Sequence, residues 1–110
     1  MHDPRLTEFI RLFNNQAFFE SHEILEELWL ECSGDQKEFY RGLIQCAVAL
    51  AHCQRNNRIG ATQVSARALA TLKRFGAERE GILVGQLVED CENFLSSRKI
   101  DYPRIILASD

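Results

Sequence analysis

Hydrophobic residues recur at helical spacing along most of the chain. The first such stretch carries them at Leu6, Phe9, Ile10 and Phe13, three or four positions apart. It follows Asp3 and Pro4, a pair suited to a helix N-terminus because aspartate caps the first turn and proline fits the first helical position. The other proline is Pro103, so the long central part of the chain contains no proline that would interrupt a helix. The pattern predicts an all-α fold.

The same spacing predicts five helices, each bounded by residues that commonly cap or end a helix. They are expected at about residues 4–14, 18–32, 35–53, 57–76 and 84–95. The third begins with Asp35 and Glu38, which resemble a capping box. Because few strongly polar residues interrupt this helix, we expect it to be the central and most buried one. The C-terminal segment 101–107 is expected to lie extended over a compact bundle.

Composition restricts the class of protein. With 110 residues, 45% hydrophobic and 26% charged, the chain is expected to form one globular domain spanning 1–110. The formal net charge is −3 and basic residues are spread along the chain, which argues against nucleic-acid binding. No apolar run approaches the roughly 20 residues that cross a bilayer, and the N-terminus does not resemble a signal peptide. We therefore expect a cytoplasmic protein that does not enter a membrane.

Other reactive or charged residues have simple structural explanations. The cysteines are Cys32, Cys46, Cys53 and Cys91. None form a Cys-x-x-Cys pair, so buried free thiols are favoured over a zinc ribbon. Lys73, Arg74 and Arg79 suit the C-terminal end of a helix better than a phosphate-binding patch.

Two polar stripes on neighbouring predicted helices carry the candidate chemistry. On a helical wheel of about 100° per residue, His22 and Glu26 fall close to Trp29, on the side expected to face the bundle. The next helix carries Arg41, Gln45 and His52 at spacings that form one narrow stripe on an otherwise apolar helix. Buried polar groups need partners, so we expect the two stripes to face each other or a ligand.

The residues in these stripes resemble a known family, domain of unknown function 309. The resemblance rests on F-F-E-S-H-E-I-L-E-E-L-W at 18–29, F-Y-R-G-L-I-Q-C-A-V at 39–48 and His52 followed by R-N-N-R-I-G-A from Arg55. It implies an all-helical bundle. The sequence departs from the family pattern at Asn56, where glycine is usual. The family has no established activity. The signature positions are His22, Glu23, Glu26, Trp29, Arg41, Gly42, Gln45 and His52.

Two functional hypotheses follow from the stripes. In the first, His22, Glu26 and His52 bind a divalent metal ion, as histidine and carboxylate side chains do in helical bundles. In the second, Trp29, Arg41 and Gln45 bind a small polar or anionic ligand. As an enzyme, the protein would use His22 or His52 as a general base oriented by Glu26, which favours proton transfer or metal-assisted hydrolysis.

A structural alternative needs no ligand. In it, Glu26 pairs with Arg41, the histidines bond to Gln45 or to the backbone, and the network fixes the register of the helices. The chain would then be a noncatalytic structural or interaction domain. Alanine-rich helix faces, such as the one at 61–70, also suit a homo-oligomer.

Overall fold

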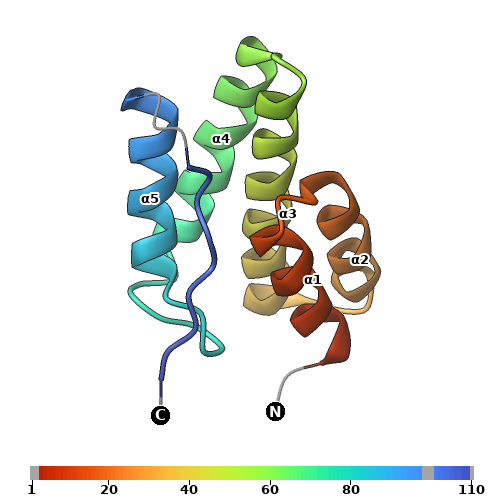
Figure 1. The fold of residues 1–110 in the computed structure, drawn as a ribbon. Helices are drawn as coiled ribbons and strands as arrows, with labels where there is room; N and C mark the ends of the chain where they lie inside the picture. The colour runs from red at the N-terminus through yellow and green to blue at the C-terminus, as the bar shows by residue number, and fades with distance from the viewer. Residues whose placement is uncertain (1–2, 98–100, 110) are drawn as a thin grey trace.

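A computed structural model describes residues 3–97 and 101–109. It contains five helices in chain order: α1 (Pro4–Asn14), α2 (Phe18–Leu30), α3 (Gly34–Gln54), α4 (Arg58–Lys73) and α5 (Val84–Ser97) (Figure 1). The predicted all-α fold and the number of helices are therefore confirmed. No helix in the described residues combines the length and apolar character needed to cross a membrane.

The polar residues that begin and end the helices act largely as predicted. The Asp3 side chain accepts a hydrogen bond of 2.8 Å from the Arg5 amide at the start of α1. Asn57 caps α4 by accepting from the Gly60 amide at 3.0 Å, and Asn56 before it is left-handed, with a φ of 60°. These contacts satisfy amides that a helix leaves unpaired at its N-terminus.

The predicted start of the third helix is wrong in detail. Asp35 does not begin α3: Gly34 is already its first residue, and the N-cap Ser33 makes no side-chain capping bond. Glu38 therefore does not complete a capping box and instead pairs with Arg41 on the same helix. The N-cap of α2 is Ala17, preceded by the left-handed Gln16 with a φ of 64°.

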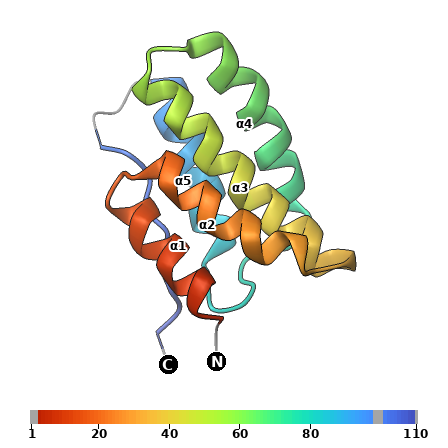
Figure 2. The same cartoon turned by 90° about the vertical axis from the view of Figure 1, so that its right-hand side faces the viewer.

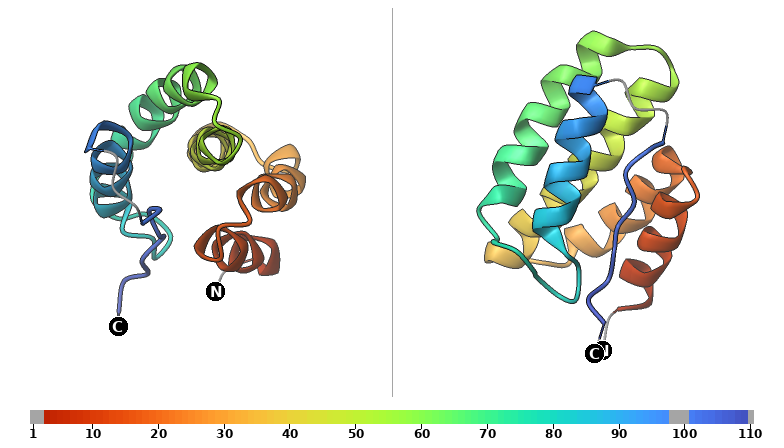
Figure 3. Two further views of the ribbon diagram at one scale, coloured as in Figure 1. Left: turned by 45° about the horizontal axis from the view of Figure 1, so that its top comes forward. Right: turned by 60° about the vertical axis from the view of Figure 1, so that its left-hand side comes forward.

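Helix α3 lies between α2 and α4, which confirms its predicted central position. Seen along the bundle, the helices follow one another in chain order around a common core (Figure 3). Figure 2 shows α3 and α4 side by side; α2 packs on the other flank of α3, and α1 packs on α2. One hydrophobic core joins these layers, and its largest fully buried side chains include Phe9, Phe13, Phe18, Phe39 and Leu72.

The C-terminal segment runs extended between α5 and α1, as predicted (Figures 1 and 3). Asn14 at the end of α1 holds it through a reciprocal pair of bonds. The Asn14 Nδ2 donates to the Ile105 carbonyl at 3.0 Å, and the Ile105 amide donates to the Asn14 Oδ1 at 2.7 Å. Ile105 is buried, so this clamp places an apolar residue in the core at the position where the helices leave a gap.

The cysteines are free thiols, as predicted, and two of them meet in the core. The sulfur atoms of Cys46 on α3 and Cys91 on α5 lie 3.3 Å apart. Hydrogen bonding to Cys46 and burial raise the pKa of the Cys91 thiol well above its ordinary value. Both effects disfavour the reactive thiolate, so the pair acts as apolar filling between the two helices.

A close approach of α3 and α4 depends on Gly42. A Cβ atom at this position would lie 2.8 Å from Leu72 Cδ2 and 3.1 Å from Thr71 Cγ2. Real side-chain contacts are longer, so α4 packs directly on the backbone of α3 at this point. Only glycine allows the two helices to keep this separation.

We expect Gly42→Ala to lower the free energy of unfolding by about 1–3 kcal/mol, because the added methyl group overpacks the α3–α4 contact. Urea denaturation followed by circular dichroism measures this change. Gly85→Ala is the matched control, since a Cβ there would lie 3.6 Å from the nearest atom, Ala77 Cα, an ordinary contact. The control should be neutral or up to about 1 kcal/mol stabilising. Equal effects of both changes would contradict the proposed role of Gly42.

Candidate functional site

Helix α2 does not turn both polar candidates toward the core. Its buried residues are Phe18, Ser21, Leu25 and Leu28. At about 100° per residue, the centre of this face lies about 80° from His22 and about 120° from Glu26. His22 is accordingly half-buried at the border of the face, and Glu26 is exposed. The prediction that Glu26 points into the bundle is therefore wrong, because Ser21 occupies the buried face instead.

His22 packs against the turn that precedes it. Its ring lies edge-on to Phe19, with centroids 4.9 Å apart, and its Nδ1 lies 2.5 Å from the Phe19 carbonyl oxygen. A carbonyl oxygen can only accept, so Nδ1 is the donor in this contact. Arg55, at the end of α3, reaches to within 5.2 Å of the Phe19 ring centroid and connects the two helices.

The polar stripe on α3 follows the outer side of that helix. Arg41 is exposed, while Gln45 and His52 are half-buried. Arg41 forms its ion pair with Glu38 on the same helix, not with Glu26 as the structural alternative expects. His52 lies with its Nδ1 3.3 Å from the Asn57 side-chain nitrogen. The apolar residues of α3 fill both of its packed flanks, so only the remaining side was open to polar residues.

The three predicted metal ligands do not form one site. Within residues 3–97 and 101–109, no three His, Cys, Asp or Glu residues are grouped so that they could hold a metal ion. His22 lies against Phe19, Glu26 faces solvent and His52 lies at the Asn57 end of α3. Within the described residues, Glu26 contacts neither His22 nor His52. The predicted general base oriented by Glu26 is therefore not assembled in this structure.

The predicted ligand-binding residues fall along one edge of the molecule, which we call the outer edge: Trp29 of α2 with Lys37, Arg41 and Gln45 of α3. Lys37 was not among the predicted residues. Its ammonium nitrogen lies 4.3 Å from the Trp29 ring centroid, a cation–π contact that joins the two helices. Lys37, Arg41 and Gln45 follow at intervals of four residues, so neighbouring members are about 5–6 Å apart at Cβ.

Two polar atoms of the outer edge are buried without a partner. The Trp29 Nε1 and the Gln45 Oε1 make no hydrogen bond to any described residue. The first can only donate and the second can only accept. An unpaired buried polar group costs about 1–3 kcal/mol, so both atoms have unused binding capacity.

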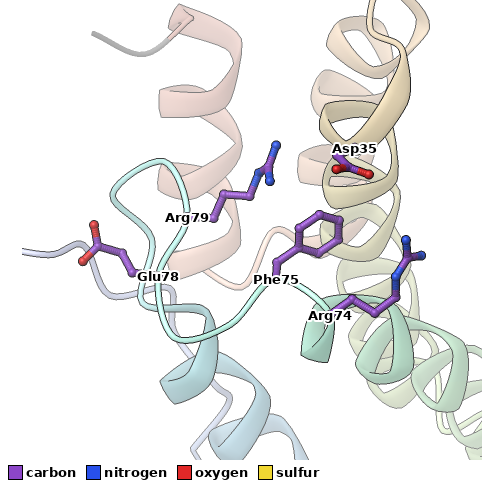
Figure 4. Close-up of a pocket in the computed structure, with 5 residues that line it drawn as sticks. All are labelled: Asp35, Arg74, Phe75, Glu78 and Arg79. Carbon is purple, nitrogen blue, oxygen red and sulfur yellow. The ribbon is translucent and has the colours of Figure 1, made fainter.

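A cavity of about 280 Å³ lies elsewhere, between the first turn of α3 and the connection from α4 to α5 (Figure 4). We call it the arginine cavity; it is lined by Asp35, Arg74, Phe75, Glu78 and Arg79. Sequence reasoning placed Arg74 and Arg79 at a helix end and did not identify the cavity. Its only signal in the sequence is a phenylalanine and two arginines close to Gly76 and Gly81.

We expect Glu26→Gln to change the free energy of unfolding by less than about 0.5 kcal/mol, because Glu26 is exposed and has no ion pair or hydrogen bond within the described residues. Thermal and urea denaturation test this value. Leu25→Ala, one position away on the buried face, should cost about 2–5 kcal/mol. If Glu26→Gln lost several kcal/mol of unfolding free energy, that result would support the structural alternative, in which Glu26 belongs to a buried network.

Comparison with known proteins agrees with this architecture. A family model described as "Domain of unknown function (DUF309)" matches residues 6–64, which run from α1 into α4 and include all the predicted site residues. An uncharacterized protein of Aquifex aeolicus (strain VF5) is 33% identical over 92 residues, covering 83% of this chain and 28% of that protein. The uncharacterized protein YpuF of Bacillus subtilis (strain 168) is 40% identical over 75 residues, covering 66% of this chain and 43% of YpuF.

The chain thus spans less than half the length of these two relatives. The family match covers more than half of the present chain and contains the signature at His22, Trp29, Arg41, Gln45 and His52. The resemblance seen in the sequence is therefore confirmed, and the chain belongs to the family of domain of unknown function 309 proteins.

Proposed function

We propose that the protein binds a small polar ligand at the outer edge, through Trp29, Arg41 and Gln45 together with Lys37. The observation that carries this proposal is the pair of buried, unpartnered atoms, Trp29 Nε1 and Gln45 Oε1. Both belong to residues that the sequence marks as ligand-binding. A residue kept for packing alone would gain stability from an apolar side chain at the same place.

The chemistry of the edge specifies what the ligand must offer. Trp29 Nε1, the Lys37 ammonium and the Arg41 guanidinium are donors, so the ligand needs acceptor oxygens. Gln45 Oε1 needs a donor, so the ligand also carries an N–H or O–H group. Amino acids, amides and hydroxy acids meet both requirements. The proposal includes neither a metal ion nor hydrolysis, because His22, Glu26 and His52 are not assembled with the outer edge.

A homo-oligomer is a separate expectation for which no contact in the structure argues. Large exposed hydrophobic side chains, such as Leu30 on α2 and Ile59 on α4, lie on different helices. Scattered residues of this kind are normal on the surface of a monomer. The outer edge therefore has the stronger physical argument.

We expect Gln45→Met to abolish ligand binding while raising the free energy of unfolding by up to about 1–2 kcal/mol, since it replaces an unpartnered acceptor with an apolar side chain of similar size. The chain has a single tryptophan, so fluorescence reports directly from the outer edge. A panel of amino acids, amides and hydroxy acids should include compounds that change Trp29 fluorescence saturably in the wild type and not in Gln45→Met.

Gln63→Met is the control, because it makes the same chemical change on an exposed position of α4. It should leave ligand binding intact and give no comparable gain in stability. A Gln45→Met protein that is destabilised by 1 kcal/mol or more would show that Oε1 has an intramolecular partner. Failure of every compound to alter the fluorescence would remove the proposal for these ligand classes.

A further inference from the structure

The two arginines of the arginine cavity share one aromatic ring. The Cζ atom of Arg79 lies 4.9 Å from the centroid of Phe75, and the Cζ atom of Arg74 lies 5.7 Å from it. Figure 4 shows both side chains beside the Phe75 ring, one on each side. Phe75 therefore carries one guanidinium group on each side, and both arginines line the cavity. Both arginines come from the segment between α4 and α5, whereas Asp35 belongs to α3.

Arg79 is held rigidly before any ligand arrives. Its guanidinium lies 5.4 Å from the centroid of Phe39 as well as against Phe75, and its Nη2 donates to the Gln36 Oε1 at 3.1 Å. Its Nε is buried without a hydrogen-bond partner, 3.8 Å from Glu80 Oε2. A side chain fixed in this way loses little conformational entropy on binding. Its remaining N–H groups can still donate to a ligand in the cavity.

Glu80 is itself held in place from the opposite side. Its Oε1 accepts a hydrogen bond of 2.7 Å from the Tyr40 hydroxyl, which in turn accepts one of 2.7 Å from the Gln36 amide. Burial, and then the bond to the Glu80 carboxylate, raise the pKa of Tyr40 well above its ordinary value, so the hydroxyl keeps its proton and remains a donor. Gln36, Tyr40 and Glu80 are thus positioning residues for Arg79.

The backbone that carries Arg79 is a strained turn. Arg79 and Ile82 exchange two backbone hydrogen bonds of 3.0 and 2.9 Å across Glu80 and Gly81, both of which have positive φ values, 52° and 79°. A left-handed glutamate is unfavourable and persists only where its surroundings fix it. They do so here, because Ile82 is fully buried and the Ala108 amide donates to the Gly81 carbonyl at 2.7 Å. These contacts therefore hold the turn, and with it Arg79, in one defined position.

Arg74 supplies the charge that remains uncompensated. It is exposed at the end of α4, and within the described residues it has no ion pair. Of the two acidic residues that line the cavity, Glu78 points away from Phe75 in Figure 4, and only Asp35 faces it. Asp35 opposes an anion and lowers the affinity of the cavity for it. Glu80 offsets the charge of Arg79, so the charge available to a ligand is that of Arg74.

We propose that the arginine cavity binds an oxyanion group, a phosphate or a carboxylate of a small molecule, beside Phe75 and through the guanidinium groups of Arg74 and Arg79. Guanidinium groups donate paired, charge-assisted hydrogen bonds to both kinds of group. The rigid Arg79 fixes the oxyanion and the exposed Arg74 closes over it, with Phe75 as the apolar wall. The site is separate from the outer edge and does not depend on the function proposed there.

Nitrogen-15 NMR titration of the full chain with sodium phosphate, and separately with sodium acetate, tests this site. We expect saturable shifts of the Arg74 and Arg79 Nε–H signals and of the Gly76 amide. Saturation by phosphate alone assigns a phosphate-bearing ligand, and saturation by acetate alone assigns a carboxylate. Equal shifts with sodium chloride at matched ionic strength would overturn the proposal, because they would report only the screening of charge.

Three variants test whether the oxyanion binds in the arginine cavity. Arg74→Gln should weaken the bound oxyanion at least about tenfold, because a charge-assisted bond is lost. Arg67→Gln removes the same charge from an exposed position of α4 outside the cavity and should leave the affinity unchanged. Asp35→Asn should strengthen binding. Equal weakening by Arg74→Gln and Arg67→Gln, or weakening by Asp35→Asn, would contradict the site.

Arg79→Lys separates binding from folding. It keeps the positive charge but loses the planar group that lies against Phe39 and Phe75. We expect a folded protein, judged by its amide spectrum, whose oxyanion affinity falls at least about tenfold. Unchanged affinity in a folded Arg79→Lys protein would limit Arg79 to a structural role and overturn the proposal.

Discussion

Helix α3 buries side chains on two flanks at once, because α2 packs against one side and α4 against the other. Gly42 permits the second of these contacts by bringing the backbone of α3 against Leu72. Burial on both flanks leaves α3 a single narrow side for residues that cannot enter the core. The positions of its polar residues follow from this constraint, and so does the location of the outer edge.

The outer edge combines residues that are partly buried with atoms that lack partners. Lys37 covers the face of the Trp29 ring and Arg41 pairs with Glu38, while among the described residues the indole Nε1 finds no acceptor and the Gln45 Oε1 finds no donor. A packing network would have paired these groups, because each unpaired one lowers stability.

The C-terminal segment organises the second site, at the N-terminal end of α3. The bonds of Ile106 and Ala108 to the α4–α5 connection hold the strained turn at Glu80 and Gly81. That turn presents Arg79 to Phe39 and Phe75, residues of α3 and of the chain just after α4. The arginine cavity therefore needs the tail, the connection and α3 together, and no one of these segments could form it alone.

The sequence by itself determined the helices. Their hydrophobic spacing, the Asp3 and Asn57 caps and the nearly apolar character of α3 are local properties, set by the backbone and by residues a few positions away. The resemblance to the family also followed from short segments. The same segments contain the candidate residues Trp29, Arg41 and Gln45, but they do not show which residues surround them in the fold.

Only the tertiary structure decided what those residues face. A wheel gives the angle between His22 and Glu26 but not which angle points to the core, and Ser21 and Leu28 rotated that face away from Glu26. The contact of Lys37 with Trp29 and the meeting of Cys46 with Cys91 depend on how helices pack, as does the arginine cavity, where Asp35 meets residues 74–79. Such contacts depend on the sum of many weak packing interactions, which no short segment of sequence contains.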